Sequence, residues 1–234
     1  MSTLLAASHL LVICQALDLR ALGEELREAL PEFIHSSLLD AFPSLTSDVI
    51  TTSLVPVIIP SLMEALERTT TLETKTRMRK VAGAGVLPLV TALSTSPVPG
   101  ADLGALPIFI TALAVRLEKK LTELRCAYLG VHPNAVRGAS ATAEVPEVAY
   151  RGAAPASKYL SPRTRALYEF VRVTLGVRMH GAGNLRGNVF GMQEGNVDLG
   201  EGTIGDGISV ICEAIRDGRI GRIVVGMVEG IVGL

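Results

Sequence analysis

Residues 3–17 are the stretch that most constrains how this chain of 234 residues can fold. Their side chains are apolar on every side of a helical projection, which predicts a helix buried all round rather than an amphipathic surface helix. From Leu19 to Leu30 the apolar residues recur three or four positions apart, with charged residues opposite them. This second pattern predicts that the same helix continues with one buried and one solvated face. Such a helix suits the interior of a large helical bundle.

The composition narrows the classes of function. The 22 Lys and Arg residues nearly balance the 23 Asp and Glu residues, whereas a nucleic-acid-binding domain usually carries a strongly basic patch. With 48% hydrophobic and 19% charged residues, the chain is too apolar to be disordered. We therefore expect a globular protein that binds no nucleic acid and covers much of its surface with other chains.

Secretion and membrane insertion are not expected. The apolar residues 4–17 are too few to span a bilayer and are interrupted by His9 and Gln15. No basic residue precedes them, as a secretory signal would require. The cysteines are far apart and lack metal-ligand spacing, so they are expected to be buried thiols in a reducing compartment, the cytoplasm. These cysteines are Cys14, Cys126 and Cys212.

Helical periodicity also dominates the rest of residues 1–129, which are expected to supply bundle helices. Pro56 and Pro60 should make one of these helices irregular, and Gly83 and Gly85 should kink the next. The additional helices are predicted over residues 45–69, 72–94 and 106–128.

A long loop over residues 130–160, rich in Ala, Gly and Pro, is expected to lead to C-terminal helices over 161–234. The first of these helices should begin with Ser161 as N-cap and Pro162 in its first turn, and should end at Gly176. The residues predicted on its buried face are Leu167, Phe170, Val171 and Leu175.

A second loop, polar and Gly-rich, covers residues 181–202. A helix is predicted from Thr203 to Gly218, and the apolar tail over 220–234 fits either a strand or a short helix. The sequence therefore predicts an all-α fold with a single domain over residues 1–234. The residues predicted on the buried face of the helix after Thr203 are Ile204, Ile208, Ile211 and Ile215.

No motif in the sequence predicts a catalytic, cofactor-binding or metal-binding residue. Residues 200–205 match the Gly-rich dinucleotide fingerprint, but no strand precedes them, which favours a simple turn before a helix. The basic run 75–80 is typical of a solvated helix face rather than an anion-binding patch. A Gly-x-Ser-x-Gly elbow is absent. The histidines are scattered without ligand spacing, and His9 is expected in the core; they are His9, His35, His132 and His180.

Asp18 and Arg20 interrupt the first helix with charge. They lie on different sides of the helix and cannot pair well with each other. We expect each to find a partner on another helix or another chain, with Gln15 making a neighbouring buried hydrogen bond. The alternative is that both are solvated and only mark the start of the amphipathic half.

Three stretches resemble the phenylalanine ammonia-lyases, particularly the fungal ones, within the aromatic amino acid lyase and histidase family. Cys14–Ala21 resembles a helix motif in the later part of these enzymes. Residues 160–172, with 175–177, are similar to their near-terminal helix. The strings 203–205, 213–215 and 217–220 resemble their C-terminal signature, and residues 66–69 fit between them more weakly. The order and spacing agree, so the chain resembles the C-terminal third of a lyase.

The resemblance implies an all-α, L-aspartase-like helical bundle that assembles as a tetramer. It implies deamination of phenylalanine, or of tyrosine or histidine in relatives, to the unsaturated acid, trans-cinnamate for phenylalanine, and ammonia, as in phenylpropanoid and secondary metabolism. The family's electrophile, methylidene-imidazolone, forms from an internal Ala-Ser-Gly, and a Tyr acts as base.

None of this machinery maps onto the sequence. It contains no Ala-Ser-Gly; the nearest string is Gly138-Ala139-Ser140-Ala141, in which Ala replaces the required Gly. The family's catalytic Tyr and the Asn, Gln and Glu around its substrate belong to segments that would precede Met1. No cofactor is therefore expected in this chain.

Three hypotheses follow from the resemblance. The chain is a partial or split lyase, or a non-catalytic subunit that assembles with a complete lyase, or a truncated lyase with another reaction in fungal secondary metabolism. The first two imply a homo-oligomer or a hetero-oligomer with a complete lyase, and an aromatic amino acid as substrate only through the family.

Overall fold

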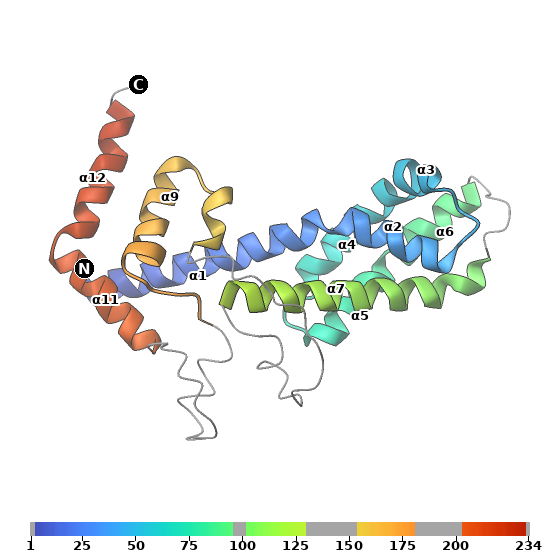
Figure 1. The fold of residues 1–234 in the computed structure, drawn as a ribbon, viewed down its shortest axis with the longest axis horizontal. Helices are drawn as coiled ribbons and strands as arrows, with labels where there is room; N and C mark the ends of the chain where they lie inside the picture. The colour runs from blue at the N-terminus through green and yellow to red at the C-terminus, as the bar shows by residue number, and fades with distance from the viewer. Residues whose placement is uncertain (1–2, 96–101, 130–153, 181–202, 233–234) are drawn as a thin grey trace, which may run out of the picture. The chain divides into compact units, whose positions relative to one another are not determined.

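The computed structural model describes residues 3–95, 102–129, 154–180 and 203–232, and every regular element in these ranges is a helix (Figure 1). The predicted all-α fold is confirmed. The chain divides into two compact units, one made of Met1–Gly23 with Arg125–Leu234 and the other of Glu24–Leu124. Helices α1 (Thr3–Glu28) and α7 (Leu106–Leu129) contribute residues to both units.

The core of the Glu24–Leu124 unit is built from apolar residues spaced four apart. On α2 and α7 such residues form continuous stripes with no exposed surface, the pattern of helices that bury one face. They are Leu30, Ile34 and Leu38 on α2, and Phe109, Leu113 and Leu117 on α7. The elements between α1 and α7 are α2 (Leu30–Ala41), α3 (Ser47–Val49), a π-helical turn η1 (Ile50–Leu54), α4 (Val55–Arg68), α5 (Thr74–Ala84), α6 (Val86–Thr95) and a 3-10 turn η2 (Leu103–Ala105).

Helix α2 is an element that the sequence pattern did not predict. Leu30 continues the apolar stripe of the first helix, a pattern that predicts one helix through Leu30, but α1 ends at Glu28. Pro31 lies in the first turn of α2, where its missing N–H is not needed. The same missing N–H interrupts the hydrogen-bond ladder that would have continued α1.

The predicted irregular helix over residues 45–69 is confirmed as irregular and is divided into α3, η1 and α4. Neither Pro56 nor Pro60 can donate a backbone hydrogen bond to the preceding turn. The Val55 N–H bonds to the carbonyl of Ile50, five residues back, which places the widened turn directly before Pro56.

The kink predicted within residues 72–94 is a complete break at Gly85, between α5 and α6. A Cβ on Gly85 would lie 3.0 Å from Ile58 Cγ2 and 3.4 Å from Leu62 Cδ2. Ile58 and Leu62 are fully buried on α4. The absence of a side chain at Gly85 therefore lets the α5–α6 junction approach α4 closely.

We expect Gly85→Ala to lower the free energy of unfolding by about 1–3 kcal/mol, because the added methyl overpacks a filled core. Gly83→Ala is the matched control: its Cβ would meet nothing within 4 Å, so the substitution should stabilise by about 0.4–1 kcal/mol. Urea denaturation of the two variants checks the difference. Equal changes in both would show that the close approach at Gly85 is unimportant.

The other unit contains η3 (Pro155–Tyr159), α9 (Pro162–Glu169), a π-helical turn η4 (Phe170–Thr174), α11 (Ile204–Arg216) and α12 (Arg219–Val232). Ser161 caps α9 by accepting from the Thr164 N–H, and Pro162 follows it. Gly176 has the positive φ of a chain reversal. These three predictions are confirmed.

The C-terminal tail forms the helix α12 rather than a strand, after Gly218 at positive φ. Thr203 and Asp206 form a capping box at the start of α11, and α12 packs against α9 and α11 (Figure 1). The predicted buried face of α11 is correct at Ile211 but wrong at Ile204, which is 45% exposed one residue after the cap. Residues 130–153 and 181–202 of the two predicted loops lie outside the described residues.

Among the residues that the structure describes, helix α1 is buried along one side and exposed along the other, so the predicted burial on all sides is not seen within this part of the chain. Ala7, Leu11 and Cys14 form one buried stripe with Asp18. The opposite side is exposed and includes His9, which the sequence placed in the core. The large apolar residues on that side are 44–64% exposed: Leu4, Leu5, Val12, Ile13 and Leu19.

Two helical stretches, Thr3–Ala41 and Ser47–Arg68, are long and apolar enough to cross a membrane. Core helices of soluble proteins and signal sequences can also be this long and this apolar. This finding alone therefore does not assign either stretch to a membrane.

Candidate functional site

A buried polar cluster centres on Asp18 of α1. The Tyr168 hydroxyl donates a hydrogen bond to Asp18 Oδ1, and Arg172 Nη2 donates to Asp18 Oδ2. Asp18 has no exposed surface, and Tyr168 and Arg172 are each 1% exposed. The prediction that Asp18 pairs with another helix is confirmed, and its partners lie 150 and 154 residues further along the chain.

Tyr168 and Arg172 reach the same carboxylate because they are four residues apart at the junction of α9 and η4. Residues at this spacing lie one above the other on a helix face. The sequence placed Leu167 and Phe170 on the buried face, but both are only half-buried. Of the predicted face, Val171 is buried as expected and Leu175 is half-buried.

Arg172 and Tyr168 also bind the backbone of two other segments. Arg172 Nη1 donates to the carbonyl oxygens of Val177 at 2.9 Å and Arg178 at 2.6 Å. The Tyr168 hydroxyl oxygen accepts from the Ala156 N–H at 3.1 Å. The cluster therefore links α1 to the segments on both sides of α9.

Gln15, one turn before Asp18, adds a second contact to the same region. Its Nε2 donates to the carbonyl oxygen of His180 at 2.7 Å, and its Oε1 accepts from the His180 N–H at 3.0 Å. This confirms the hydrogen bond expected for Gln15. Arg20 is exposed within this chain, because two positions along a helix turn a side chain about 200° away from Asp18. A partner for Arg20 on another chain stays a prediction.

The electrostatics of the cluster are dominated by burial. Burial raises the pKa of the Asp18 carboxyl, and the Arg172 charge and the bonds from Tyr168 and Arg172 oppose that effect. Burial and the hydrogen bond to Asp18 raise the pKa of Tyr168. Burial also raises the pKa of the Cys14 thiol to about 11, against the opposing effect of Arg172. Cys14 is therefore a neutral thiol at physiological pH and a poor nucleophile.

The other residues singled out in the sequence do not converge on this cluster. Within the described ranges, no three His, Cys, Asp or Glu side chains could hold a metal ion together. His35 Nε2 lies 2.8 Å from Ser47 Oγ, whereas His180 contacts Gln15. His132 lies outside the described residues. All three cysteines are free and buried, which confirms their predicted burial.

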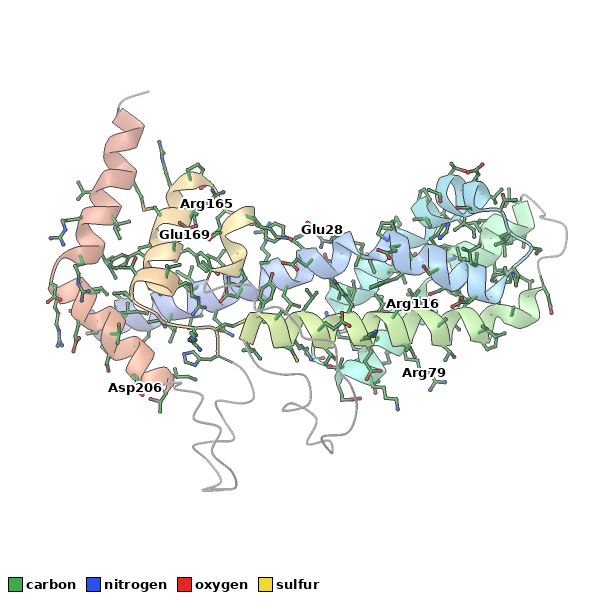
Figure 2. All side chains as sticks on the ribbon, in the orientation of Figure 1. Glu28, Arg79, Arg116, Arg165, Glu169 and Asp206 are labelled. Carbon is green, nitrogen blue, oxygen red and sulfur yellow. The ribbon has the colours of Figure 1, made fainter. Side chains whose placement is uncertain are left out.

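The basic run on α5 is mostly solvated, as predicted. Lys75, Arg79 and Lys80 are exposed, and the Arg79 side chain points away from the helices (Figure 2). Arg77 instead donates to the Leu66 carbonyl at 2.9 Å. Of the Gly-rich string, only Thr203, Ile204 and Gly205 are described, at the start of α11; Gly138–Ala141 is not.

No family model matches the chain. The phenylalanine ammonia-lyase of Strobilurus tenacellus is 40% identical over 229 residues, and phenylalanine ammonia-lyase 1 of Pleurotus ostreatus is 37% identical over 230 residues. Each match covers 96% of this chain but only 28% of the relative.

Solved structures give the same result. The crystal structure of phenylalanine ammonia-lyase from the yeast Rhodosporidium toruloides superimposes with a TM-score of 0.67 at 29% identity. The match covers 96% of this chain and 29% of that chain. This chain is therefore related, over nearly its whole length, to one segment of the phenylalanine ammonia-lyases, and the resemblance inferred from the three sequence stretches is confirmed.

Proposed function

We propose that this chain is a helical scaffold segment of a phenylalanine ammonia-lyase-like enzyme and does not deaminate phenylalanine by itself. The observation that carries this proposal is the coverage: the chain matches these lyases over 96% of its own length but spans 28% of theirs. The absence of Ala-Ser-Gly from its 234 residues supports the same conclusion. Phenylalanine, with trans-cinnamate and ammonia as products, is the substrate that the relatives suggest for the whole enzyme.

The chemistry explains why a scaffold segment alone should be inactive. Without a carbon electrophile, the α-amino group is a poor leaving group and the β-proton is not acidic. A positioned acid or base contributes only about 10²–10⁴-fold, whereas enzymes typically accelerate reactions by about 10⁶–10¹⁷-fold. Moreover, the side chains of Asp18, Tyr168 and Arg172 are buried and hydrogen-bonded to one another, so they are not placed to act on a substrate as such an acid or base.

The purified chain is therefore expected to form no cinnamate from phenylalanine, and no corresponding acid from tyrosine or histidine. Ultraviolet absorbance and chromatography of the products check this, with a heat-denatured sample as control. Cinnamate production at enzyme-like turnover that co-purifies with the chain, in a preparation free of host lyase, would contradict the proposal.

We also propose that the chain works in an assembly in the cytoplasm, either with further copies or with a more complete lyase. The exposed side of α1 supports this proposal. The exposed residues of α1 recur with the four-three spacing of a helix–helix seam. Exposed apolar side chains that form one contiguous patch usually mark an interaction surface. The exposed residues at this spacing are Leu5, His9, Val12, Ala16, Leu19 and Gly23.

The isolated chain is expected to self-associate rather than stay a monomer, because this face is apolar and the described residues leave it exposed. Light scattering should give a mass above that of one chain, and Val12→Lys should shift the mass toward the monomer by introducing a charge into the seam. Ser209→Lys, at an exposed site on α11, adds the same charge elsewhere and should not. A wild-type monomer with a sharp cooperative melt and no binding of a hydrophobic dye would overturn the expectation.

A further inference from the structure

We propose that Asp18 couples the order of two separate segments, residues 154–160 and 177–180, so that both are held in place or released together. The inference concerns the internal organisation of the chain and does not depend on the proposed function. It rests on the two oxygens of one buried carboxylate, each of which begins a different path of hydrogen bonds.

The first path runs to residues 154–160. Asp18 Oδ1 accepts from the Tyr168 hydroxyl, and the hydroxyl oxygen accepts from the Ala156 N–H. The bond to Asp18 directs the Tyr168 proton toward the carboxylate, which leaves the oxygen lone pairs to face the Ala156 N–H. Ala156 is 1% exposed, so its N–H depends on the protein for a partner.

The second path runs to residues 177–180. Asp18 Oδ2 accepts from Arg172 Nη2, and Arg172 Nη1 donates to the carbonyl oxygens of Val177 and Arg178. The carboxylate fixes the plane of the guanidinium, and that plane determines where the two carbonyl oxygens can bind. A buried Arg172 without Asp18 would keep its charge but lose the group that orients it.

Residues 177–180 are also placed close to α11. A Cβ on Gly207 would lie 3.2 Å from Val177 Cγ1 and 3.6 Å from His180 Nε2. The segment therefore fits tightly between α1, which binds it through Gln15, and the start of α11. A shift of residues 177–180 should reach α11 through this close contact.

Coupling follows because Asp18 is shared by the two paths. Buried hydrogen bonds in one network polarise one another and are lost together more readily than independent bonds. Residues that share a network partner also show non-additive effects of substitution. Weakening the hydrogen bond between Tyr168 and Asp18 should therefore loosen residues 177–180, which lie on the other path, through Arg172.

Amide hydrogen exchange of the full chain, resolved by residue, tests the coupling. Tyr168→Phe removes only the hydroxyl and is expected to raise the exchange rate of Ala156 about 2- to 10-fold, the effect of one lost hydrogen bond. The proposal predicts an increase of similar size at the amides of Val177 and His180. The converse variant, Arg172→Lys, should raise the exchange rate at Ala156 as well as at Val177 and His180.

Arg165→Met is the matched control. Arg165 lies on the same helix α9 (Figure 2) and donates to the Leu160 carbonyl at 3.1 Å, so it contacts residues 154–160 without passing through Asp18. It should raise exchange rates in 154–160 alone. If Tyr168→Phe fails to fold, Asp18→Asn keeps the shape of the carboxylate and should raise exchange in both segments. Faster exchange confined to 154–160 in Tyr168→Phe, or to one segment in Asp18→Asn, would overturn the proposal.

Discussion

Replacing Asp18 by alanine is expected to lower the free energy of unfolding by about 3–5 kcal/mol, because it leaves the Arg172 charge buried without its carboxylate. The two side chains have no exposed surface, so water cannot replace the lost partner. The Tyr168 hydroxyl loses its acceptor in the same substitution. Since a domain typically has about 5–15 kcal/mol of stability, the soluble yield should fall as well.

Glu24→Ala on the same helix is the control for this loss. Glu24 pairs with Arg27 at 2.9 Å, and the two side chains are 28% and 41% exposed, so the pair should contribute less than about 1 kcal/mol. Urea denaturation and thermal melting of the two variants provide the comparison. Small and equal losses would show that Asp18 only marks a solvated boundary on α1.

The second large effect is expected for Arg172→Met, which should also cost about 3–5 kcal/mol, because it strands the Asp18 carboxylate in the core. Combining it with Asp18→Leu should recover much of the loss, since replacing both members of a buried ion pair by apolar residues is often neutral or stabilising. The Val177 and Arg178 carbonyls lose their donor in the double variant, which limits the recovery.

A double-mutant cycle from urea denaturation measures this recovery. The predicted result is a strongly non-additive cycle, in which the double variant is more stable than either single variant. Losses that simply add would mean that Asp18 and Arg172 contribute independently, and the central role of their ion pair would be rejected.

The sequence correctly predicted those starts, ends and irregularities of helices that depend on residues within about one turn. Ser161 and Pro162 predicted the start of α9 because capping and the missing proline N–H act within one turn. Gly176 predicted the end of the continuous helical segment formed by α9 and η4 for the same reason, through its freedom to adopt positive φ. Pro56 and Pro60 predicted the irregularity before α4.

The site depends on contacts that no local pattern contains. The sequence indicated that Asp18 needs a partner, but Tyr168 and Arg172 are 150 or more residues away, and an arginine on a helix usually predicts a solvated position. The π-helical turn at Phe170–Thr174 also shifts the side-chain phase that a period of 3.6 residues assumes. The spacing of four between Tyr168 and Arg172 was the available signal, but the predicted buried face rested on the apolar residues Leu167, Phe170, Val171 and Leu175 instead.

Helix α1 shows the limit in the other direction. Its apolar composition predicted burial on all sides, yet the described residues of the chain cover only the side that carries Ala7, Leu11 and Cys14. The apolar composition of a helix reflects all the surfaces against which it packs, including those of other chains. A single chain shows only the contacts that it makes with itself. The exposed row on α1 is therefore consistent with the proposed assembly.

Restoration of a deficient lyase tests the central claim most directly. The Strobilurus tenacellus lyase, with the segment that this chain matches removed, would be co-expressed with the chain and assayed for cinnamate. We predict that the wild-type chain co-purifies with the shortened lyase and restores cinnamate formation, and that the Asp18→Ala chain restores much less. A folded wild-type chain that neither co-purifies with the shortened lyase nor raises its activity would contradict the role of this chain as a lyase scaffold segment.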